Sequence, residues 1–521
     1  MPKKSEKIAE VSEEEVVNLA IDTIKMKKQA LIFVSTKSGA EATAEKIAKK
    51  LDENADCTEI ASEILHVLSR PTKQCEKLAK AAGKGIVFHH SGLHHRQREI
   101  IEDSFREGKI KIICCTPTLA AGVDLPAFRT ILKDLKRYNG RWGMSWIPVL
   151  EYQQMCGRAG RPGKEDFGEA IAIASTENEK EEIYEKYVIG EVEEIYSKLA
   201  VEPVLRTYIL SLIATEVVGS KRKLIDFFKK TFWAQQYKDM EKLSRIIIKM
   251  TSLLQDFEFI ETKGKKDSDF ISASDIEDDK LVATPIGKRV AELYIDPITA
   301  NNLITGIKKS GKKPSAFSLL QLISYQLELR PRLRMRKNDY EMVSGKIIGE
   351  DLLSIEPAIY DPEYSDFLDS VKTAIFLESW INENTEEDIL EKFSVRPGEI
   401  KAKTDNADWL LYAMEELSRM LQRQELIKEI AKLRIRVENG VKEEVIPLMQ
   451  LKGIGRVRAR KLFSNKIREL KDLKEISFSA LAQIIGAKIA ASVKEQLGEK
   501  TEPVPEGKRK GQLSLLGYRE G

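Results

Sequence analysis

Short apolar runs alternate with helical segments over the first third of the chain, and this alternation constrains the fold more than any other feature. The apolar runs are Ala30–Val34, Gly85–Phe88, Ile110–Cys115, Phe128–Leu132 and Ala170–Ala174. Strands separated by helices form βαβ units, in which the strands lie parallel and the helices cover their faces. The sequence therefore predicts an α/β domain with a parallel sheet over residues 1–185.

The remaining chain changes character in stages. Residues 186–297 are first helical and then end in a β-hairpin, which favours a winged helix over an arbitrary α/β linker domain. Residues 298–435 are helical throughout, and residues 436–500 form a small helix-hairpin-helix-like unit. Residues 501–521 contain prolines and a glycine and are expected to form a flexible tail.

Composition narrows the class of protein. The net charge of +3 means that any nucleic-acid surface must be local. The five cysteines show no C-x-x-C spacing, so neither a zinc knuckle nor a disulfide framework is expected. This cysteine usage predicts a protein of the reducing cytoplasm. No apolar run is long enough to span a membrane, and the first ten residues lack the apolar core of a signal peptide.

Two arginines three residues apart mark a candidate phosphate site. Arg158 and Arg161 follow a helical run that ends at Gln154-Met-Cys-Gly157, and Gly160 lies between them. Guanidinium groups suit the charge that develops on a transferring phosphoryl group. The segment therefore indicates two guanidinium groups that are both directed at one triphosphate. The alternative is a surface helix end with salt-bridged arginines.

A second candidate segment leaves a buried strand about forty residues earlier. Thr116 and Thr118 follow this strand, and Gly122 and Asp124 come next. Ligands bind at the carboxyl ends of parallel strands, where hydroxyls and free backbone N–H groups can hold a nucleic-acid phosphate. Asp124 can accept a hydrogen bond from a ribose or from an arginine of the same site.

Histidines gather at the end of another strand, in the turn formed by His89, His90, Ser91 and Gly92. A metal site formed by His89, His90, His94 and His95 is one interpretation, but no carboxylate or cysteine completes a convincing ligand set. We therefore predict no metal and expect this turn to contact a DNA phosphate.

Trp409 lies on a strong amphipathic helix. The apolar stripe of this helix consists of Leu410, Met414, Leu417 and Leu421, and Trp409 points about a quarter-turn away from it. A tryptophan exposed on a rigid helix is a platform for stacking a base. The alternative is that it packs against a neighbouring domain.

A basic cluster lies near the C-terminus. Residues 451–470 hold seven Lys or Arg against one Glu. The turn at Gly453 and Gly455 would present backbone N–H groups to a DNA phosphate, and the basic side chains are Lys452, Arg456, Arg458 and Arg460. The alternative is a solvated basic face. A second basic run, residues 330–337, either lines a strand channel or is a solvated or domain-pairing segment.

Four of these segments together resemble the second RecA-like domain of a superfamily-two helicase. LIFVSTKSGAE is similar to motif IV, HHSGL to the DNA-contacting motif that follows, TPTLAAGVDLPA to motif V and QMCGRAGRPG to motif VI. The residues of motifs V and VI are most similar to those of the archaeal Hjm/HELQ type of DNA helicase. LVATPIGKRVAELYIDP and LKGIGRVRARKLF resemble the winged helix and the C-terminal DNA-binding unit of that family.

The resemblance implies roles at the nucleotide. Arg158 and Arg161 would face the γ-phosphate of ATP, one of them as arginine finger, and Gln154 would help to couple the site. Gly122 and Asp124 would lie near the nucleotide.

The resemblance also implies a path for DNA. Thr36 and Thr118 would hold phosphates of the strand. A β-hairpin between motifs V and VI, flanked by Tyr138, Trp142 and Trp146, would wedge the duplex apart unless it is a plain surface hairpin. Asn139-Gly140 is a favourable dipeptide for its turn.

The helix that carries Trp409 resembles the ratchet helix of the family. The family pairs this tryptophan with a basic residue about two turns earlier. Here that position is Ala402, with Lys401 and Lys403 beside it.

The chain departs from the family in one respect. It contains neither G-x-x-x-x-G-K-[ST] nor a D-E-x-H box; Gly219-Ser-Lys221 lacks the first glycine of the loop, and Asp52-Glu53-Asn54 follows a helix instead of a buried strand. By the resemblance, ATP and Mg²⁺ would be bound mainly by a first motor domain, supplied in cis or as a partner.

The resemblance implies an ATP-dependent 3′-to-5′ DNA helicase of repair, recombination and replication restart, with single-stranded and forked DNA as partners. A related RNA helicase and a non-catalytic DNA-binding fragment remain alternatives. Gln512–Tyr518 spaces a glutamine, an aliphatic and an aromatic residue like peptides that dock on sliding clamps. It would bind a clamp or a single-strand-binding protein unless it is a disordered end.

Overall fold

The computed structural model describes residues 7–68, 70–138, 143–161, 163, 165–263 and 280–498. The chain forms two compact units. The first unit consists of residues 1–379 and 384–430, and the second of residues 380–383 and 431–521.

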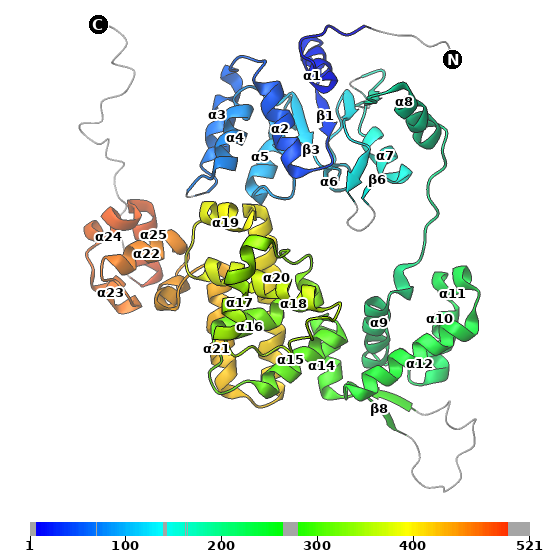
Figure 1. The fold of residues 1–521 in the computed structure, drawn as a ribbon. Helices are drawn as coiled ribbons and strands as arrows, with labels where there is room; N and C mark the ends of the chain where they lie inside the picture. The colour runs from blue at the N-terminus through cyan, green and yellow to red at the C-terminus, as the bar shows by residue number, and fades with distance from the viewer. Residues whose placement is uncertain are drawn as a thin grey trace. The chain divides into compact units, whose positions relative to one another are not determined.

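A five-stranded parallel sheet organises the N-terminal part of the first unit (Figure 1). Its strands, in spatial order, are β2 (Ile86–His89), β3 (Ile112–Cys115), β1 (Ala30–Phe33), β4 (Arg129–Leu132) and β7 (Glu169–Ala172). The parallel sheet and all five of its strands agree with the sequence prediction to within two residues at each end. The first four strands in this order are buried along their whole length. Burial on both faces explains why β3 and β1 are apolar throughout.

Helices pack around this sheet and fix its edges. They are α1 (Glu15–Lys25), α2 (Lys37–Ala48), α3 (Thr58–Leu65), α4 (Lys73–Ala82), α5 (His95–Arg106), α6 (Thr118–Gly122) and α7 (Val149–Cys156). Helix α2 packs against β2 and β3. Buried Arg129 of β4 donates to Asp22 of α1 and to Glu169 of β7, so one side chain ties a helix to two strands.

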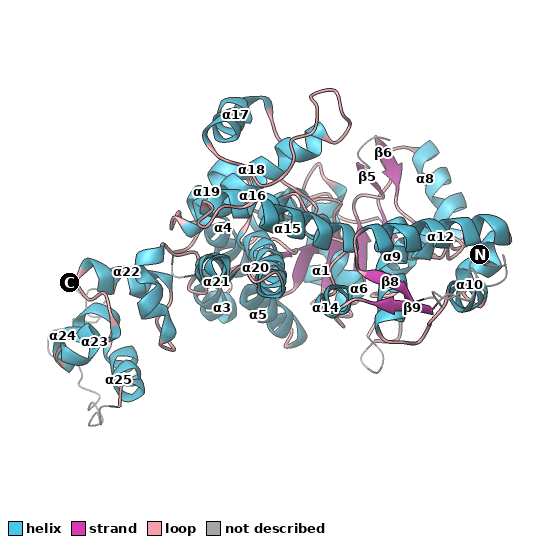
Figure 2. Cartoon of the chain, turned by 90° about the horizontal axis from the view of Figure 1, so that it is seen from below, coloured by secondary structure: helices cyan, strands magenta, loops and turns pink. Residues whose placement is uncertain are grey.

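A separate antiparallel hairpin lies between α6 and α7. Strand β5 (Lys136–Tyr138) pairs with β6 (Met144–Trp146), with Lys136 opposite Trp146. Figure 2 shows this pair apart from the main sheet. The structure therefore contains the predicted hairpin, although its turn, residues 139–142, lies outside the described residues.

Helices and a second hairpin form the predicted winged helix. The helices are α9 (Glu202–Ala214), α10 (Lys221–Lys229), α11 (Phe232–Tyr237), α12 (Met240–Asp256) and α14 (Pro285–Leu293). Strand β8 (Ile260–Lys263) pairs with β9 (Lys280–Ala283), and residues 264–279 between them lie outside the described residues. A Cβ on Gly287 would lie 1.8 Å from the Phe259 carbonyl oxygen, so glycine lets α14 pack onto this hairpin. Between the sheet and this domain lie α8 (Glu177–Ile183) and η3 (Tyr184–Val188).

The rest of the first unit is helical, as predicted (Figure 1). Its elements are α15 (Pro297–Lys309), α16 (Ala316–Ser324), α17 (Tyr340–Gly349), α18 (Tyr364–Ile381), α19 (Glu386–Phe393), α20 (Pro397–Met420) and α21 (Gln424–Asn439), of which α18 and α21 end in the second unit. Arg206 of α9 and Asp296, the N-cap of α15, form a buried bidentate pair that ties the winged helix to these helices.

The second unit is a small helical bundle with a core of its own. Its elements are η7 (Glu443–Gln450), α22 (Arg456–Ser464), α23 (Leu470–Glu475), α24 (Phe478–Ile485) and α25 (Ala487–Gln496). Trp380 donates its indole N–H to the Val437 carbonyl and anchors the ends of α18 and α21 in this unit. In the described part of the chain, no helix has the length and apolarity needed to cross a bilayer.

Candidate functional site

The segments around Asp124 and Arg158 are joined at the edge of the main sheet. The Arg158 guanidinium donates through Nε and Nη2 to the Ala120 carbonyl, and its Nη1 lies 3.3 Å from Asp124 Oδ1. The backbone reinforces this joint, because Ala127 N donates to Arg158 O and Gly160 N to Ala127 O. Asp124 thus pairs with an arginine of the same site, one of the two partners considered for it.

Arg161 is held differently. Its Nε donates to the Pro126 carbonyl at 2.9 Å, and its guanidinium lies 5.7 Å from the centroid of the Phe105 ring. No residue within the described ranges hydrogen-bonds its two terminal nitrogens. Gln154 is exposed on the preceding helix α7. A fixed stem with two unbonded NH2 groups fits an anionic ligand such as a phosphate.

The predicted threonines lie beyond neighbouring strands of the sheet. Thr36 follows β1 and caps α2, with its Oγ1 accepting from Gly39 N at 3.0 Å. Thr116 follows β3, and its hydroxyl lies 2.9 Å from that of Thr118. Thr36 and Thr118 are exposed, whereas Thr116 is buried. The sheet topology therefore brings exposed hydroxyls to one edge, where Gly122 is also exposed.

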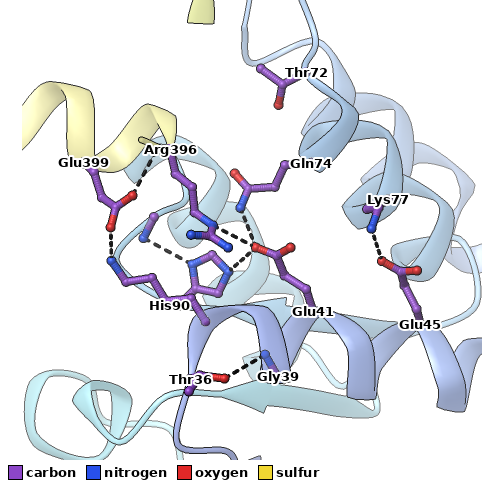
Figure 3. A network of polar contacts seen from close by, with 12 residues as sticks. Thr36, Gly39, Glu41, Glu45, Thr72, Gln74, Lys77, His90, Arg396 and Glu399 are labelled. Atoms are coloured by element: carbon purple, nitrogen blue, oxygen red, sulfur yellow. Dashed lines mark hydrogen bonds and ion pairs between the residues drawn. The ribbon is translucent and has the colours of Figure 1, made fainter. Parts of the chain in front are cut away.

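The histidine turn faces inward. His90 is 0% exposed, and its Nε2 lies 3.2 Å from Glu41 Oε1. Figure 3 shows the His90 ring directed toward the Glu41 carboxylate. Its Nδ1 accepts from Gly92 N at 3.2 Å, and Gly92 is buried. Their expected contact with DNA is not supported by these positions, because neither residue is accessible to a phosphate. Ser91 is the exposed member of the turn.

Burial and the neighbouring polar groups set the protonation of His90 and Glu41. Burial lowers the pKa of His90, and this effect outweighs the hydrogen bond and the charge of Glu41. Burial would raise the pKa of Glu41, but the hydrogen bonds of His90 and Gln74 and the charge of Arg396 together lower it to about 2. A neutral ring whose Nδ1 accepts from Gly92 N carries its proton on Nε2 and donates it to the Glu41 carboxylate. Within the described ranges, no group of three His, Cys, Asp or Glu is arranged to hold a metal ion.

The residues that flank the β5–β6 hairpin differ in exposure. Tyr138 is 69% exposed at the tip end of β5. Trp146 is half-buried, with the Lys136 ammonium 4.0 Å from its ring centroid and Tyr187 against its edge. Trp142 lies outside the described residues. Tyr138 is therefore the described aromatic residue of the hairpin that is accessible to DNA.

Trp409 is half-buried on α20, the expected ratchet helix, and does not stand free. Its indole Nε1 donates to the Leu293 carbonyl of α14 at 3.0 Å, so one edge of the ring contacts the winged helix. The adjacent Leu410 and Leu411 are fully buried, which agrees with the predicted orientation of Trp409 away from the apolar stripe. The ring is therefore only partly exposed, because the end of α14 covers one edge, as the alternative of packing against a neighbouring domain anticipates.

The basic residues near α20 are only partly available. Lys401 is exposed and pairs with Asp405 one turn away. Lys403 is half-buried and donates to the Pro331 carbonyl. In the basic run 330–337, the Arg332 side chain is 5% exposed and donates to the Ser324 and Tyr325 carbonyls at the end of α16. Arg332 thus has a structural role, which no charge count could distinguish from a solvated one.

The Gly-x-Gly turn of the second unit precedes α22. Gly453 has φ +89°, a conformation that favours glycine, and Gly455 is the N-cap of α22. Lys452 and Arg458 are exposed, whereas the Arg456 guanidinium lies 4.6 Å from the Trp380 ring centroid. Arg460, the last basic residue of the cluster, is bound to Glu383 and Glu444. Two of the four basic side chains therefore remain on the surface.

One group of residues was missed by sequence reasoning. Arg396 and Glu399 at the start of α20 contact Glu41 and Lys37 of α2 (Figure 3). They lie more than 350 residues apart in the chain, so no local pattern joins them. The signal in the sequence was the pair of glycines, Gly92 and Gly398. The structure shows why they are glycines, since a Cβ on either one would clash with the other segment.

A parallel sheet whose strand ends carry joined arginine and threonine segments, followed by a winged helix and helical domains, defines the second motor domain of a superfamily-two helicase with its accessory domains. Family models agree. Residues 62–163 match the helicase conserved C-terminal domain, residues 317–440 match archaeal helicase domain 4, and residues 445–499 match a SAM-like helix-hairpin-helix tandem.

Individual relatives extend the likeness to most of the chain. The ATP-dependent DNA helicase Hel308 of Methanocella arvoryzae is 38% identical over 504 residues, which are 94% of this chain and 66% of that protein. The Hel308 proteins of Pyrococcus horikoshii and Pyrococcus abyssi are 38% and 37% identical, with 67% and 68% of their lengths covered. The chain belongs to the Hel308 family of ATP-dependent DNA helicases and spans about two thirds of the length of these relatives.

Proposed function

We propose that this chain provides the second motor domain, the strand-separating hairpin and the single-strand ratchet of a 3′-to-5′ DNA helicase that acts on forked and recombination DNA. The joint between Asp124 and Arg158 is the observation that carries the proposal. It holds together the two segments that a helicase uses to sense a nucleotide and a nucleic-acid strand.

Arg161 is the proposed arginine finger. Its stem is fixed by the Pro126 carbonyl, and its terminal N–H groups make no hydrogen bond within the described ranges. Arg158 has a different proposed role, because its guanidinium is occupied by Ala120 and Asp124 and so transmits changes between the two segments. ATP with Mg²⁺ would supply the phosphoryl group, and a first motor domain, in cis or as a partner, would hold it.

DNA would follow the exposed hydroxyls and the helical domains. Thr36, Ser91 and Thr118 are exposed around the strand ends and suit phosphate contacts. Tyr138 would meet the duplex at the hairpin, and Trp409 would stack on a base. The hydrogen bond from Trp409 to Leu293 fixes the ring, so less freedom is lost when a base stacks on it.

The C-terminal unit would add sequence-independent affinity. Lys452 and Arg458 lie beside the Gly453 turn, and Gly455 opens α22. Such a turn can present backbone N–H groups and two cations to the phosphates of one strand.

Unwinding of labelled substrates tests the proposal. The chain is supplied with a P-loop motor domain of a Hel308 relative and given fork DNA, 3′-tailed DNA, 5′-tailed DNA or the equivalent RNA. We expect ATP-dependent unwinding of the fork and the 3′-tailed DNA. Preference for the 5′ tail would contradict the polarity, and preference for RNA would favour the RNA helicase alternative.

The tail is a separate proposal. Gln512–Tyr518, outside the described residues, would dock on a sliding clamp or a single-strand-binding protein. Calorimetry of a tail peptide against each partner tests this, and a peptide in which Leu515 and Tyr518 are replaced by alanine is the control. If the tail peptide gives no heat of binding with either partner, the proposed docking is contradicted.

A further inference from the structure

The turn after β2 contacts the beginning of α20 through the backbone. Gly398 N donates to the Gly92 carbonyl at 3.0 Å. A Cβ on Gly92 would lie 2.5 Å from Arg396 Cδ, and a Cβ on Gly398 would lie 2.4 Å from the Leu93 carbonyl oxygen. Both glycines are therefore required by the close approach of these two segments.

A buried cluster of polar groups fixes this contact (Figure 3). One carboxylate oxygen, Glu41 Oε1, lies 3.0 Å from Arg396 Nε, 3.2 Å from His90 Nε2 and 2.8 Å from Gln74 Nε2. The Glu41 side chain is 13% exposed and that of Arg396 is 20% exposed. An unpaired charge in such a place is costly, so the two elements are held in one defined arrangement.

A second pair lies beside the first. Lys37 of α2 pairs with Glu399, whose other oxygen accepts from Arg396 N at 2.9 Å and caps α20. Glu399 thus sets the first turn of α20 and binds the motor domain at the same time.

Helix α20 extends this contact toward the proposed stacking residue. Trp409 lies thirteen residues after Arg396 on the same unbroken helix, roughly 20 Å along its axis at 1.5 Å per residue. Because a helix of this length is stiff, displacement at one end moves the other.

We propose that Arg396 is a positioning residue that registers the ratchet helix on the turn at residues 90–93, so that the motor domain and Trp409 respond to DNA together. This inference rests on the proposed function, because it assumes that α20 binds the strand. Arg396 acts through Glu41 and His90 and not through a contact with nucleotide or DNA.

Hydrogen–deuterium exchange of the full chain, with and without an oligothymidine strand, tests the proposal. In the wild type, DNA should slow amide exchange both in residues 90–93 and in α20 around Trp409. In Arg396→Ala, protection of α20 should persist, while the DNA-induced protection of residues 90–93 falls by about 5-fold or more, the lower range of coupling between linked sites. A merely structural role would change the melting temperature without separating these two regions.

Three further variants sharpen the result. Glu41→Gln keeps the shape of the side chain and removes its charge, and should give the same separation. Arg396→Lys retains the charge and should restore part of the coupling. Lys73→Ala removes an exposed ion pair with Glu391 of α19 and should leave the coupling unchanged.

The outcomes are distinct. Full protection of residues 90–93 in Arg396→Ala overturns the inference, because each region then responds to DNA without Arg396. Equal loss in Lys73→Ala, or global loss of protection in both Arg396→Ala and Glu41→Gln, also overturns it. A wild-type chain that does not bind the strand contradicts the proposed function instead.

Discussion

Nη1 of Arg158 lies 3.3 Å from Oδ1 of Asp124, and the Asp124 side chain is 93% exposed. An ion pair so open to solvent contributes little to stability. Its value lies in orientation, because it connects two segments that leave different elements and meet at the edge of the sheet.

Replacement of Asp124 by alanine should therefore separate function from stability. We expect the free energy of unfolding to change by less than about 1 kcal/mol. With a P-loop motor domain present, DNA-stimulated ATP hydrolysis should fall by about 10- to 100-fold, because a misplaced catalytic group is poorly aligned. Thermal melts and a coupled ATPase assay measure both, with Asp226→Ala, which removes another exposed pair, as control. Unchanged turnover would mean that the joint has no role in coupling.

Trp409→Ala should weaken binding of single-stranded DNA by about 1–3 kcal/mol, the usual cost of a lost stacking contact. Trp409→Phe retains a ring but loses the hydrogen bond to Leu293, so its loss of affinity should be smaller. Fluorescence anisotropy with a labelled oligonucleotide gives the affinities, and circular dichroism checks the fold. If Trp409→Ala binds as tightly as the wild type, the residue serves only to pack α20 against the winged helix.

Simultaneous replacement of Lys452 and Arg458 by alanine should lower the salt dependence of DNA binding. For a single strand, each lost phosphate contact reduces the slope of log affinity against log salt by about 0.7. Arg460→Ala is the matched control, because its guanidinium is already bound to Glu383 and Glu444 and its loss should affect stability instead. A slope unaltered by the double replacement would leave this cluster as a solvated surface.

Glu41 should make stability depend on acid. Burial would raise its pKa, but the hydrogen bonds of His90 and Gln74 and the charge of Arg396 lower it from 4.5 to about 2 in the folded chain. A carboxyl whose pKa is lower in the folded chain than in the unfolded chain stabilises the fold at pH values above the unfolded-state pKa. This stabilisation is lost as the pH falls from about 4.5 toward 2. Urea unfolding of the wild type between pH 5.5 and 3.5, roughly the upper part of this window, should show a steeper loss than Glu41→Gln. Parallel pH profiles would contradict the assigned ionisation.

The sheet and the helical domains could be predicted from sequence because their signals are local. Continuous apolar runs such as Ile112–Cys115 give buried strands, and small residues after them mark the strand ends. The proximity of Asp124 to Arg158 was also foreseeable as one of two alternatives, since both segments end at the same edge of a parallel sheet.

Contacts between distant elements could not be predicted in this way. The partner of Trp409 is a backbone carbonyl of another domain, which leaves no trace in residue type. The inward orientation of His90 depends on Glu41 and Arg396, which come from two other helices. Charge alone left Arg332 as a residue of a strand channel or of a solvated or domain-pairing segment, whereas its guanidinium binds carbonyls at the end of α16.

We propose that Arg161 acts on a phosphate that another domain holds, while Arg158 couples the two segments of the site, and DNA-stimulated ATP hydrolysis tests this proposal most directly. We predict that the 521-residue chain alone binds DNA but hydrolyses no ATP above background. Addition of a P-loop motor domain should produce DNA-stimulated turnover, and Arg161→Ala should abolish it while DNA binding is retained. Robust hydrolysis by the purified chain alone, lost in Arg161→Ala, would contradict the claim, because the chain would then hold the nucleotide by itself.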